Sequence, residues 1–296
     1  HEKLLILHAS KIAKSYLCPV EKVSNIIPYY IKQLKDIANE REIISWAYIS
    51  IDFLLGYNRS ECIINSDKEI GIDIIDRFRQ IIEDLKANIP IQYILGETEF
   101  YGLKFKVNEH TLIPRPETEE LVLWILEHEF NSALDIGTGS GCIPIAIKKN
   151  KNVEISAIDV SEPALLVAKE NAKTNEVKIN FFKQDILKTD NLERVDVIIS
   201  NPPYILEKEK DLILSNVLDN EPHLALFVTN ENPLLFYKKI AELSYACLSK
   251  KGLLFFEINE SFGIEIIELL KSIGFVDIEL KKDINEKDRM LKAIKN

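Results

Sequence analysis

The feature that most constrains the fold is a glycine-rich loop between an apolar strand, predicted over 133–136, and a helix, predicted over 143–149. Three glycines occupy the loop, at Gly137, Gly139 and Gly141. Glycine permits positive φ angles and lets a ligand approach the backbone closely. Strand, glycine turn and helix, in this order, open a nucleotide-binding α/β unit. The sequence therefore predicts an α/β fold with a ligand at the carboxyl ends of parallel strands.

The spacing of the glycines argues against a diphosphate ligand. Dinucleotide sites use G-x-G-x-x-G with the pyrophosphate at the helix N-terminus, whereas the third glycine here comes one residue earlier. Asp135 directly precedes the loop, where a carboxylate repels a diphosphate but suits a cationic ligand such as S-adenosylmethionine. The alternative is a glycine turn that binds nothing. The loop residues that we assign to cofactor binding are Asp135, Gly137, Thr138, Gly139, Ser140 and Gly141.

Two further predicted strands end in acidic residues. The strand over 153–158 leads to Asp159, about 20 residues beyond the glycines, where a carboxylate typically accepts hydrogen bonds from ribose hydroxyls. The strand over 179–184 leads to Asp185, which is suited to accept from an adenine amino group, with Ile186 beside the ring. Both carboxylates also have a simpler interpretation, because acidic residues are common at strand ends and helix caps. Ser161 is expected to be such a cap for the helix that follows.

A fourth strand, over 195–200, runs into the tetrapeptide Asn201-Pro202-Pro203-Tyr204. Two prolines hold the backbone stiff and lack N–H donors, so their carbonyls have no competing donor beside them. Asn201 adds a side-chain carbonyl and Tyr204 a flat aromatic face. Two acceptors and a ring suit a planar –NH2 group, which indicates a site for an amide or an exocyclic amine. A merely rigid turn is the alternative explanation, and the glycine loop upstream argues against it.

With these motifs, the chain resembles the class I S-adenosylmethionine-dependent methyltransferases. Among them it is most similar to the HemK/PrmC-type protein-(glutamine-N5) methyltransferases, which modify bacterial peptide-chain release factors. The matching segments are 90–96, 99–103, 112–119, 221–222 and 225–226, with a weaker match at 257–259. The resemblance runs from about residue 90 to the C-terminus, whereas the first 90 residues match mainly in placement and character.

The resemblance implies a Rossmann-like, doubly wound seven-stranded sheet whose last two strands form an antiparallel hairpin. It implies S-adenosylmethionine as methyl donor and class I release factors as partners. The residues assigned to catalysis and substrate binding are Asn201, Pro202, Pro203 and Tyr204, with Asn201 also contacting the cofactor, and Phe100 and Tyr101 are further candidates for the substrate pocket. A plain aromatic core role for Phe100 and Tyr101 stays equally open.

Other positions in the matching segments leave their roles open. Arg115 and Glu117 either clamp a loop near the cofactor or pair with each other, and Glu119 lies near a helix start, where a carboxylate is favourable in any case. The chain also departs from the family pattern. Asn259 and Glu260 stand where a glycine often follows the Glu-Ile pair of the fifth strand, so the local turn is in question.

The order of predicted elements suggests three parts. Residues 1–88 repeat apolar positions at helical spacing and are predicted to form an all-helical substrate-recognition domain, with a turn at 56–60. Residues 89–117 carry prolines, glycines and alternating apolar residues, which predict a hairpin-bearing connector. Residues 118–296 alternate helices and strands, beginning with a helix over 119–130, and are predicted to form the methyltransferase domain.

Composition indicates a cytoplasmic enzyme. The net charge of −10 and pI of about 5.2 disfavour broad binding to nucleic acid, which depends on clustered Lys and Arg. No apolar stretch reaches 18 residues, so no membrane association is expected. The four cysteines, Cys18, Cys62, Cys142 and Cys247, have no metal-ligand spacing and are expected to be buried thiols. No metal is expected, and the chain is expected to be monomeric.

These observations predict methyl transfer from S-adenosylmethionine to the side-chain amide nitrogen of the glutamine in the Gly-Gly-Gln motif of release factors. Three alternatives stay open. One is glutamine methylation of another target, such as a ribosomal protein. Another is N6-adenine methylation of DNA, because an exocyclic amine makes the same demands on Asn-Pro-Pro-Tyr, although such enzymes must flip the base. The last is a cofactor-binding scaffold without catalysis.

Overall fold

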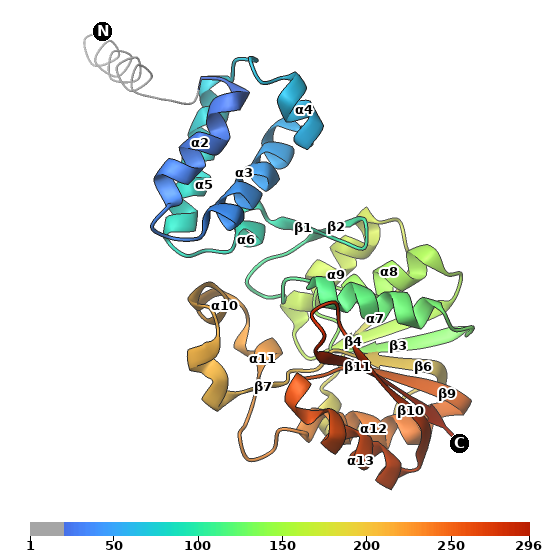
Figure 1. The fold of residues 1–296 in the computed structure, drawn as a ribbon. Coiled ribbons are helices and arrows are strands. Elements are labelled where there is room, and N and C mark those ends of the chain that lie inside the picture. Colours follow the sequence, from blue (N-terminus) through green and yellow to red (C-terminus); the bar gives the residue numbers. More distant parts are fainter. Residues whose placement is uncertain (1–20) are drawn as a thin grey trace. The chain divides into compact units, whose positions relative to one another are not determined.

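The computed structural model describes residues 21–296, and the chain divides into two compact units at Leu95/Gly96 (Figure 1). The described part of the first unit is all helical, as predicted. Its helices are α2 (Val23–Leu34), α3 (Glu40–Leu55), α4 (Arg59–Ile64), α5 (Ile72–Lys86) and α6 (Ile91–Leu95). Between α3 and α4, Gly56 adopts φ +66° and Asn58 caps α4, because glycine tolerates this backbone and asparagine accepts the free N–H groups. The predicted turn at 56–60 is confirmed, although α4 begins within it.

The helices of the first unit pack through apolar positions that recur at helical spacing. On α5, Ile75, Phe78, Ile82 and Leu85 are buried, while the acidic and basic residues between them face solvent. Tyr30 of α2 packs edge-on against Phe78, with ring centroids 6.2 Å apart. Burying one such stripe from each helix builds a separate small core, which is why this unit is compact by itself.

The second unit begins with an antiparallel hairpin, β1 (Glu97–Phe100) and β2 (Leu103–Lys106), in the segment where the connector was predicted. Tyr101 and Gly102 form its turn with φ of +53° and +70°. Positive φ at both central residues matches the right-handed twist of the two strands. Helix α7 (Pro116–Leu126) follows, starting and ending earlier than the predicted 119–130, because proline fits the first helical position.

The rest of the second unit is one doubly wound seven-stranded sheet, as predicted. Its strands lie in the order β10-β11-β9-β6-β3-β4-β5. They are β3 (Ser132–Ile136), β4 (Glu154–Asp159), β5 (Asn180–Lys183), β6 (Val195–Ser200), β9 (Leu248–Glu257), β10 (Phe275–Lys282) and β11 (Asp288–Lys295). Neighbours from β5 to β9 pair in parallel, and β11 pairs antiparallel with β9 and with β10. The predicted antiparallel hairpin of the last two strands is confirmed.

Helices cover both faces of this sheet (Figure 1). On one face, α7 and α8 (Cys142–Asn150) pack on Val197 and Ile199 of β6. On the other, α12 (Leu235–Cys247) and α13 (Gly263–Ile273) pack on Ile198. Successive side chains of a strand point to opposite faces, so the continuous apolar run of β6 feeds two cores at once.

The second unit contains further helices and one short strand pair outside the seven-stranded sheet. They are α9 (Glu162–Thr174), the 3-10 helices η1 (Ile186–Lys188), η2 (Glu207–Leu212) and η3 (Glu260–Phe262), helices α10 (Ser215–Asn220) and α11 (His223–Leu226), and the short parallel pair β7 (Ile205–Leu206) and β8 (Phe227–Val228). The Ser161 hydroxyl accepts from the backbone N–H of Ala164 and caps α9, as predicted.

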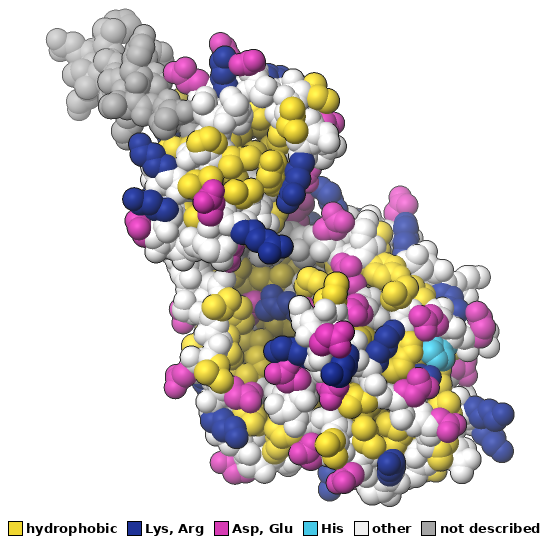
Figure 2. Space-filling view, in the orientation of Figure 1, with side chains coloured by type: hydrophobic (Ala, Val, Ile, Leu, Met, Phe, Trp, Pro, Cys, Tyr) yellow, Lys and Arg dark blue, Asp and Glu magenta, His cyan; other side chains and the backbone are white. Residues whose placement is uncertain are grey.

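The cysteines, the helix lengths and the surface charges of the described residues can be compared with what the composition predicted. Cys62, Cys142 and Cys247 are buried and unpaired, and Cys18 lies outside the described residues. None of the helices in the described part of the chain is both long and apolar enough to cross a bilayer. On the face drawn in Figure 2, basic and acidic side chains are interspersed and not gathered into one basic patch.

Candidate functional site

A pocket lies where four parallel strands end, at the point where the chain switches from one side of β3 to the other. Open α/β sheets bind ligands at such a switch point, outside the carboxyl ends of the strands. Of the predicted site residues, those that line the pocket are Gly137, Gly139, Asp159, Asp185, Ile186, Asn201, Pro202 and Pro203. The structure thus brings the glycine loop and most of the Asn-Pro-Pro-Tyr motif to one cavity.

The three loop glycines have different physical roles. Gly137 and Gly139 have φ of +76° and +53°, and a Cβ atom on either would meet nothing within 4 Å, since it would project into open space. Gly141 has φ +79°, and a Cβ there would lie 3.1 Å from Ala168 Cβ and 3.1 Å from Ile145 Cδ1. The first two glycines leave room beside the pocket, and the third allows the loop to pack tightly on α9.

The different surroundings of Gly139 and Gly141 predict different losses of stability on substitution by alanine. Gly141→Ala is expected to lower the free energy of unfolding by about 2–3 kcal/mol, because it adds overpacking to the cost of a left-handed backbone. Gly139→Ala, the matched control, bears only the backbone cost of about 1–2 kcal/mol. Urea unfolding of the two variants measures both values. Equal losses would show that packing against Ala168 contributes nothing.

Asp135 is an unpaired carboxyl group inside the protein, only 1% exposed. Within residues 21–296, neither of its carboxylate oxygens nor the Thr138 hydroxyl has a hydrogen-bond partner. Burial raises the pKa of Asp135 from its ordinary 3.8 to about 7, although the nearby Thr138 hydroxyl, not in good hydrogen-bond geometry, still favours the ionised form to a smaller extent. A buried carboxylate without partners is costly, so a site that keeps one is prepared for a donor or cation from a ligand. Asp135, Thr138, Ser140 and Gly141 do not themselves line the pocket.

Asp159 orders the loop as well as facing the pocket. Its Oδ2 accepts from the N–H of Gly139 at 2.8 Å, and its Oδ1 accepts from the N–H of Ser161 at 2.8 Å. Burial raises its pKa, although these backbone bonds favour the ionised form. Each carboxylate oxygen keeps a second lone pair, so the capping role and the predicted ribose-binding role are compatible.

Asp185 has a stronger local role than the sequence indicated. Its Oδ1 accepts from the N–H of Leu187 at 3.0 Å, and its Oδ2 pairs with Lys188 at 3.0 Å. The hydrogen bond with Lys188 is the main reason that the pKa of Asp185 is lowered. Ile186 beside it is 8% exposed and offers the pocket an apolar wall.

Phe100 and Tyr101, the two aromatic candidates for the substrate pocket, lie in different environments in the structure. Phe100 is 1% exposed and packs edge-on against Phe105 in the core, with centroids 5.9 Å apart, which favours the core interpretation. Tyr101 is half-buried at the hairpin turn, and its N–H donates to Glu119 Oε1 at 2.7 Å. Glu119 therefore fixes the hairpin turn in addition to lying near a helix start.

Arg115 and Glu117 do not pair with each other, so that alternative is wrong. Arg115 Nη2 lies 2.6 Å from Glu221 Oε1, and the Glu221 side chain is only 1% exposed. Glu117 instead accepts from Asn285 Nδ2 at 3.2 Å. Since the residues after Glu221 form part of the pocket wall, the Arg115–Glu221 pair clamps that wall in place, which was the other alternative.

Several pocket residues were not predicted from the sequence. They are His110, Leu112, Val160, Ser161, Ala164, Gln184, Ser200, Pro222, Leu224, Ala225, Phe236 and Ile240, together with the strand residues Ile136 and Ile158. The matching segments at 221–222 and 225–226 were a signal for this wall, but no local pattern indicates which distant segments meet.

Tyr204 lies beside the pocket and not among its lining residues. Its ring packs against the core beneath α12, and its hydroxyl donates to Glu257 Oε1 at 3.4 Å. Burial raises the pKa of both Tyr204 and Glu257. Glu257 Oε2 also accepts from the Thr118 hydroxyl at 2.7 Å.

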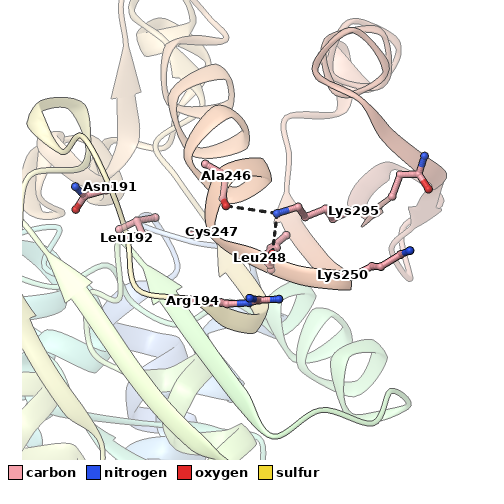
Figure 3. A pocket seen from close by; sticks show the side chains of 9 residues that line it. Asn191, Leu192, Arg194, Ala246, Cys247, Leu248, Lys250 and Lys295 are labelled. Carbon is pink, nitrogen blue, oxygen red and sulfur yellow. Dashed lines mark hydrogen bonds between the residues drawn. The ribbon is translucent and has the colours of Figure 1, made fainter.

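A second hollow lies at the other end of the same strands (Figure 3). Arg194, Lys250 and Lys295 are among its lining residues, next to the amino ends of β6 and β9. Lys295 Nζ donates to the carbonyls of Ala246 and Leu248. No predicted site residue lines this hollow, so the motifs point to the pocket at the carboxyl ends.

Comparison with known proteins agrees with this fold. Residues 117–225 match the methyltransferase small domain family, and residues 27–96 match the PrmC N-terminal domain family. The solved structure of a methyltransferase from Pyrococcus furiosus superposes with a TM-score of 0.53 at 19% identity, covering 76% of this chain and 98% of that one. At that identity the likeness shows the fold alone.

Curated relatives are far more similar in sequence. The release factor glutamine methyltransferase of Flavobacterium psychrophilum is 46% identical over 280 residues, which cover 92% of this chain and 98% of the relative. The protein of the same name from Bacteroides thetaiotaomicron is 40% identical over 275 residues, covering 91% and 99%. The chain therefore belongs to the release factor glutamine methyltransferase family.

Proposed function

We propose that this enzyme transfers a methyl group from S-adenosylmethionine to the side-chain amide nitrogen, N5, of the glutamine in the Gly-Gly-Gln motif of peptide-chain release factors. The observation that carries the proposal is the meeting of two motifs in one pocket: Gly137, Gly139 and Asp159 on one side, Asn201 and Pro202 on the other. Relatives at 46% and 40% identity bear the name of this activity.

The residues present fit S-adenosylmethionine. Gly137 and Gly139 leave space that any side chain would fill, and the carboxyl groups of Asp135 and Asp159 suit a ligand with an ammonium group and ribose hydroxyls. In this assignment Thr138, Ser140 and Gly141 shape the loop, and Asp185 and Ile186 border the adenine. When bound, S-adenosylmethionine supplies a methyl group on a sulfonium, whose S–C bond breaks as the new C–N bond forms.

The chain's own part in the reaction is to position a poor nucleophile. An amide nitrogen is weakly nucleophilic because its lone pair is delocalised into the carbonyl. Asn201 Oδ1 and the Pro202 carbonyl are the acceptors for its two N–H groups, and Pro203 keeps them rigid. As the nitrogen gains positive charge, these fixed dipoles stabilise the transition state more than the ground state. The ring of Tyr204 stacks on the amide plane, and the methylated nitrogen then releases its proton to water.

The remaining assignments follow from this substrate. We assign residues 1–88 to recognition of the release factor outside its glutamine loop, 89–117 to the connector and 118–296 to methyl transfer. The match of residues 27–96 to the PrmC N-terminal domain family supports the first of these. Release factors act on the ribosome, so we assign the enzyme to the cytoplasm. We also assign it to act as a monomer and without direct contact to nucleic acid. Tyr101 is kept as a candidate for contact with the substrate, whereas Phe100 belongs to the core.

The test is methyl transfer from labelled S-adenosylmethionine to a purified class I release factor. A release factor whose Gly-Gly-Gln glutamine is replaced by alanine serves as the control, and peptide mass mapping locates the label. We expect one methyl group on that glutamine and none on the control. Label on a ribosomal protein, or on adenine in DNA, with none on the release factor would refute the proposed substrate.

A further inference from the structure

The end of strand β9 holds Tyr204 at two points. The Tyr204 hydroxyl donates to Glu257 Oε1 at 3.4 Å, at the far end of the side chain. The Tyr204 backbone carbonyl accepts from Asn259 Nδ2 at 3.1 Å, at the near end. Two residues of one strand end, two positions apart, thus fix both the ring and the backbone of the same tyrosine.

The two holding residues are themselves anchored. Glu257 Oε2 accepts from the Thr118 hydroxyl of α7, and its backbone carbonyl accepts from the Tyr237 hydroxyl of α12 at 3.2 Å. Asn259 Oδ1 accepts from the N–H of Ser261 at 2.9 Å, which leaves its amide –NH2 group directed at Tyr204. Helices from both faces of the sheet therefore hold this strand end in place.

Asn259 directly follows Glu257 and Ile258, where the sequence left the local turn in question. Its backbone, with φ −69° and ψ 130°, is open to any residue, so no positive φ requires a glycine here. Its side chain is 9% exposed and uses both polar atoms. The asparagine therefore adds a hydrogen bond to Tyr204 that glycine has no atoms to make.

We propose that Glu257 and Asn259 are positioning residues that act through Tyr204, fixing its ring for the substrate amide and the backbone that follows the two prolines. This inference rests on the proposed function, in which that ring stacks on the amide. The hydrogen bond at the hydroxyl fixes the direction in which the ring axis points, and the hydrogen bond at the carbonyl fixes the backbone at the end of the tetrapeptide. Loss of either bond leaves binding in place and spoils the alignment for methyl transfer, so it lowers kcat more than it raises KM.

The first test compares Asn259→Asp with Glu260→Gln. The aspartate keeps the acceptor for Ser261 and loses the donor to Tyr204. Glu260 is an exposed neighbour whose pairing partner is Lys287. We expect Asn259→Asp to lower kcat about tenfold while KM for the release factor and Kd for S-adenosylmethionine stay within twofold. Glu260→Gln is expected to match the wild type, and a kcat for Asn259→Asp within twofold of it would overturn the Asn259 assignment.

The second test is a double-mutant cycle on the hydroxyl. Tyr204→Phe removes the donor, Glu257→Met removes the acceptor, and Glu257→Gln keeps an acceptor oxygen. We expect about a tenfold loss of kcat in each disruptive single variant, no further loss in their combination, and retention of most activity in Glu257→Gln. If the double variant instead loses kcat by the product of the two single losses, Glu257 does not act through Tyr204.

Hydrogen–deuterium exchange separates this inference from the proposed function. In the ligand-free protein, peptides covering residues 200–206 should exchange faster in Asn259→Asp than in the wild type or Glu260→Gln. Equal exchange in Asn259→Asp and the wild type would refute the positioning role of Asn259, even if the enzyme methylates the release factor. Faster exchange in Asn259→Asp, together with a wild-type enzyme that methylates no release factor, would support the positioning role and refute only the proposed function.

Discussion

Asn201→Ala is expected to reduce kcat for release-factor methylation by about a thousandfold, because in the proposed function its Oδ1 accepts from the nitrogen on which positive charge develops. The pocket wall it belongs to also includes Pro202 and Pro203, which the substitution leaves intact. Binding of S-adenosylmethionine should weaken far less than kcat falls, since Asn201 is one of many residues that line the pocket. Single-turnover methylation and calorimetric titration of the cofactor measure the two effects separately.

Two further variants sharpen this expectation. Asn180→Ala removes an exposed asparagine of β5 and serves as the matched control, with unchanged kcat expected. Asn201→Asp keeps one acceptor oxygen at the same position and should retain more activity than the alanine variant. A kcat for Asn201→Ala within tenfold of the wild type would refute the role of its amide in catalysis.

Asp135→Asn is expected to weaken S-adenosylmethionine binding about a hundredfold and, at pH 8, to stabilise the ligand-free protein. The carboxylate has no partner within residues 21–296 to compensate its burial, so ionising it in the folded protein is costly. In the proposed assignment, the same negative charge attracts the cationic S-adenosylmethionine. In this assignment the residue therefore contributes to binding at the expense of stability, as functional sites often do.

The pH dependence of this effect has a definite sign. The pKa of Asp135 is raised from 3.8 to about 7, so between these values the folded state keeps a proton that the unfolded state has lost. Folding stability then falls as pH rises from about 4 to about 7, by about 4 kcal/mol in total, and stays low above that. An asparagine side chain cannot ionise, so the stability advantage of Asp135→Asn should be absent near pH 4 and full at pH 8. Burial also raises the pKa of Asp159, so this residue lowers stability with rising pH equally in the wild type and in Asp135→Asn.

Urea unfolding of the ligand-free proteins at several pH values measures this difference. Asp185→Asn is a control of opposite sign, because the pKa of Asp185 is lowered and its contribution stabilises the fold above its unfolded pKa. A stability difference between Asp135→Asn and the wild type that does not change with pH would contradict the assignment. So would cofactor affinity that the substitution leaves unchanged.

Local sequence predicted most of the fold because its signals are short-range. The apolar run of β6 and the glycines that follow β3 each encode one element and its end, and the structure has those elements where they were predicted. The pocket joins Gly137, Asp159 and Asn201 because parallel strands end at one edge of the sheet. That step needed only the order of strands and helices, which the sequence supplies.

The sequence did not predict which side chains contact one another. The sequence placed Arg115 and Glu117 two residues apart and left their pairing open, whereas the structure pairs Arg115 with Glu221. It also placed Phe100 equally well in the pocket or in the core, and burial against Phe105 decides for the core. Such choices depend on which distant segments pack together, and no periodicity encodes that.

By itself, then, the sequence determined the α/β class, the glycine loop and the tetrapeptide Asn201-Pro202-Pro203-Tyr204, because backbone preferences and side-chain alternation act over a few residues. Only the tertiary structure decided that Asp135 is buried without a partner and that the end of β9 holds Tyr204. The physical reason is that desolvation and hydrogen-bond geometry are set by atoms far apart in the chain, which meet only when the sheet and both layers of helices have assembled.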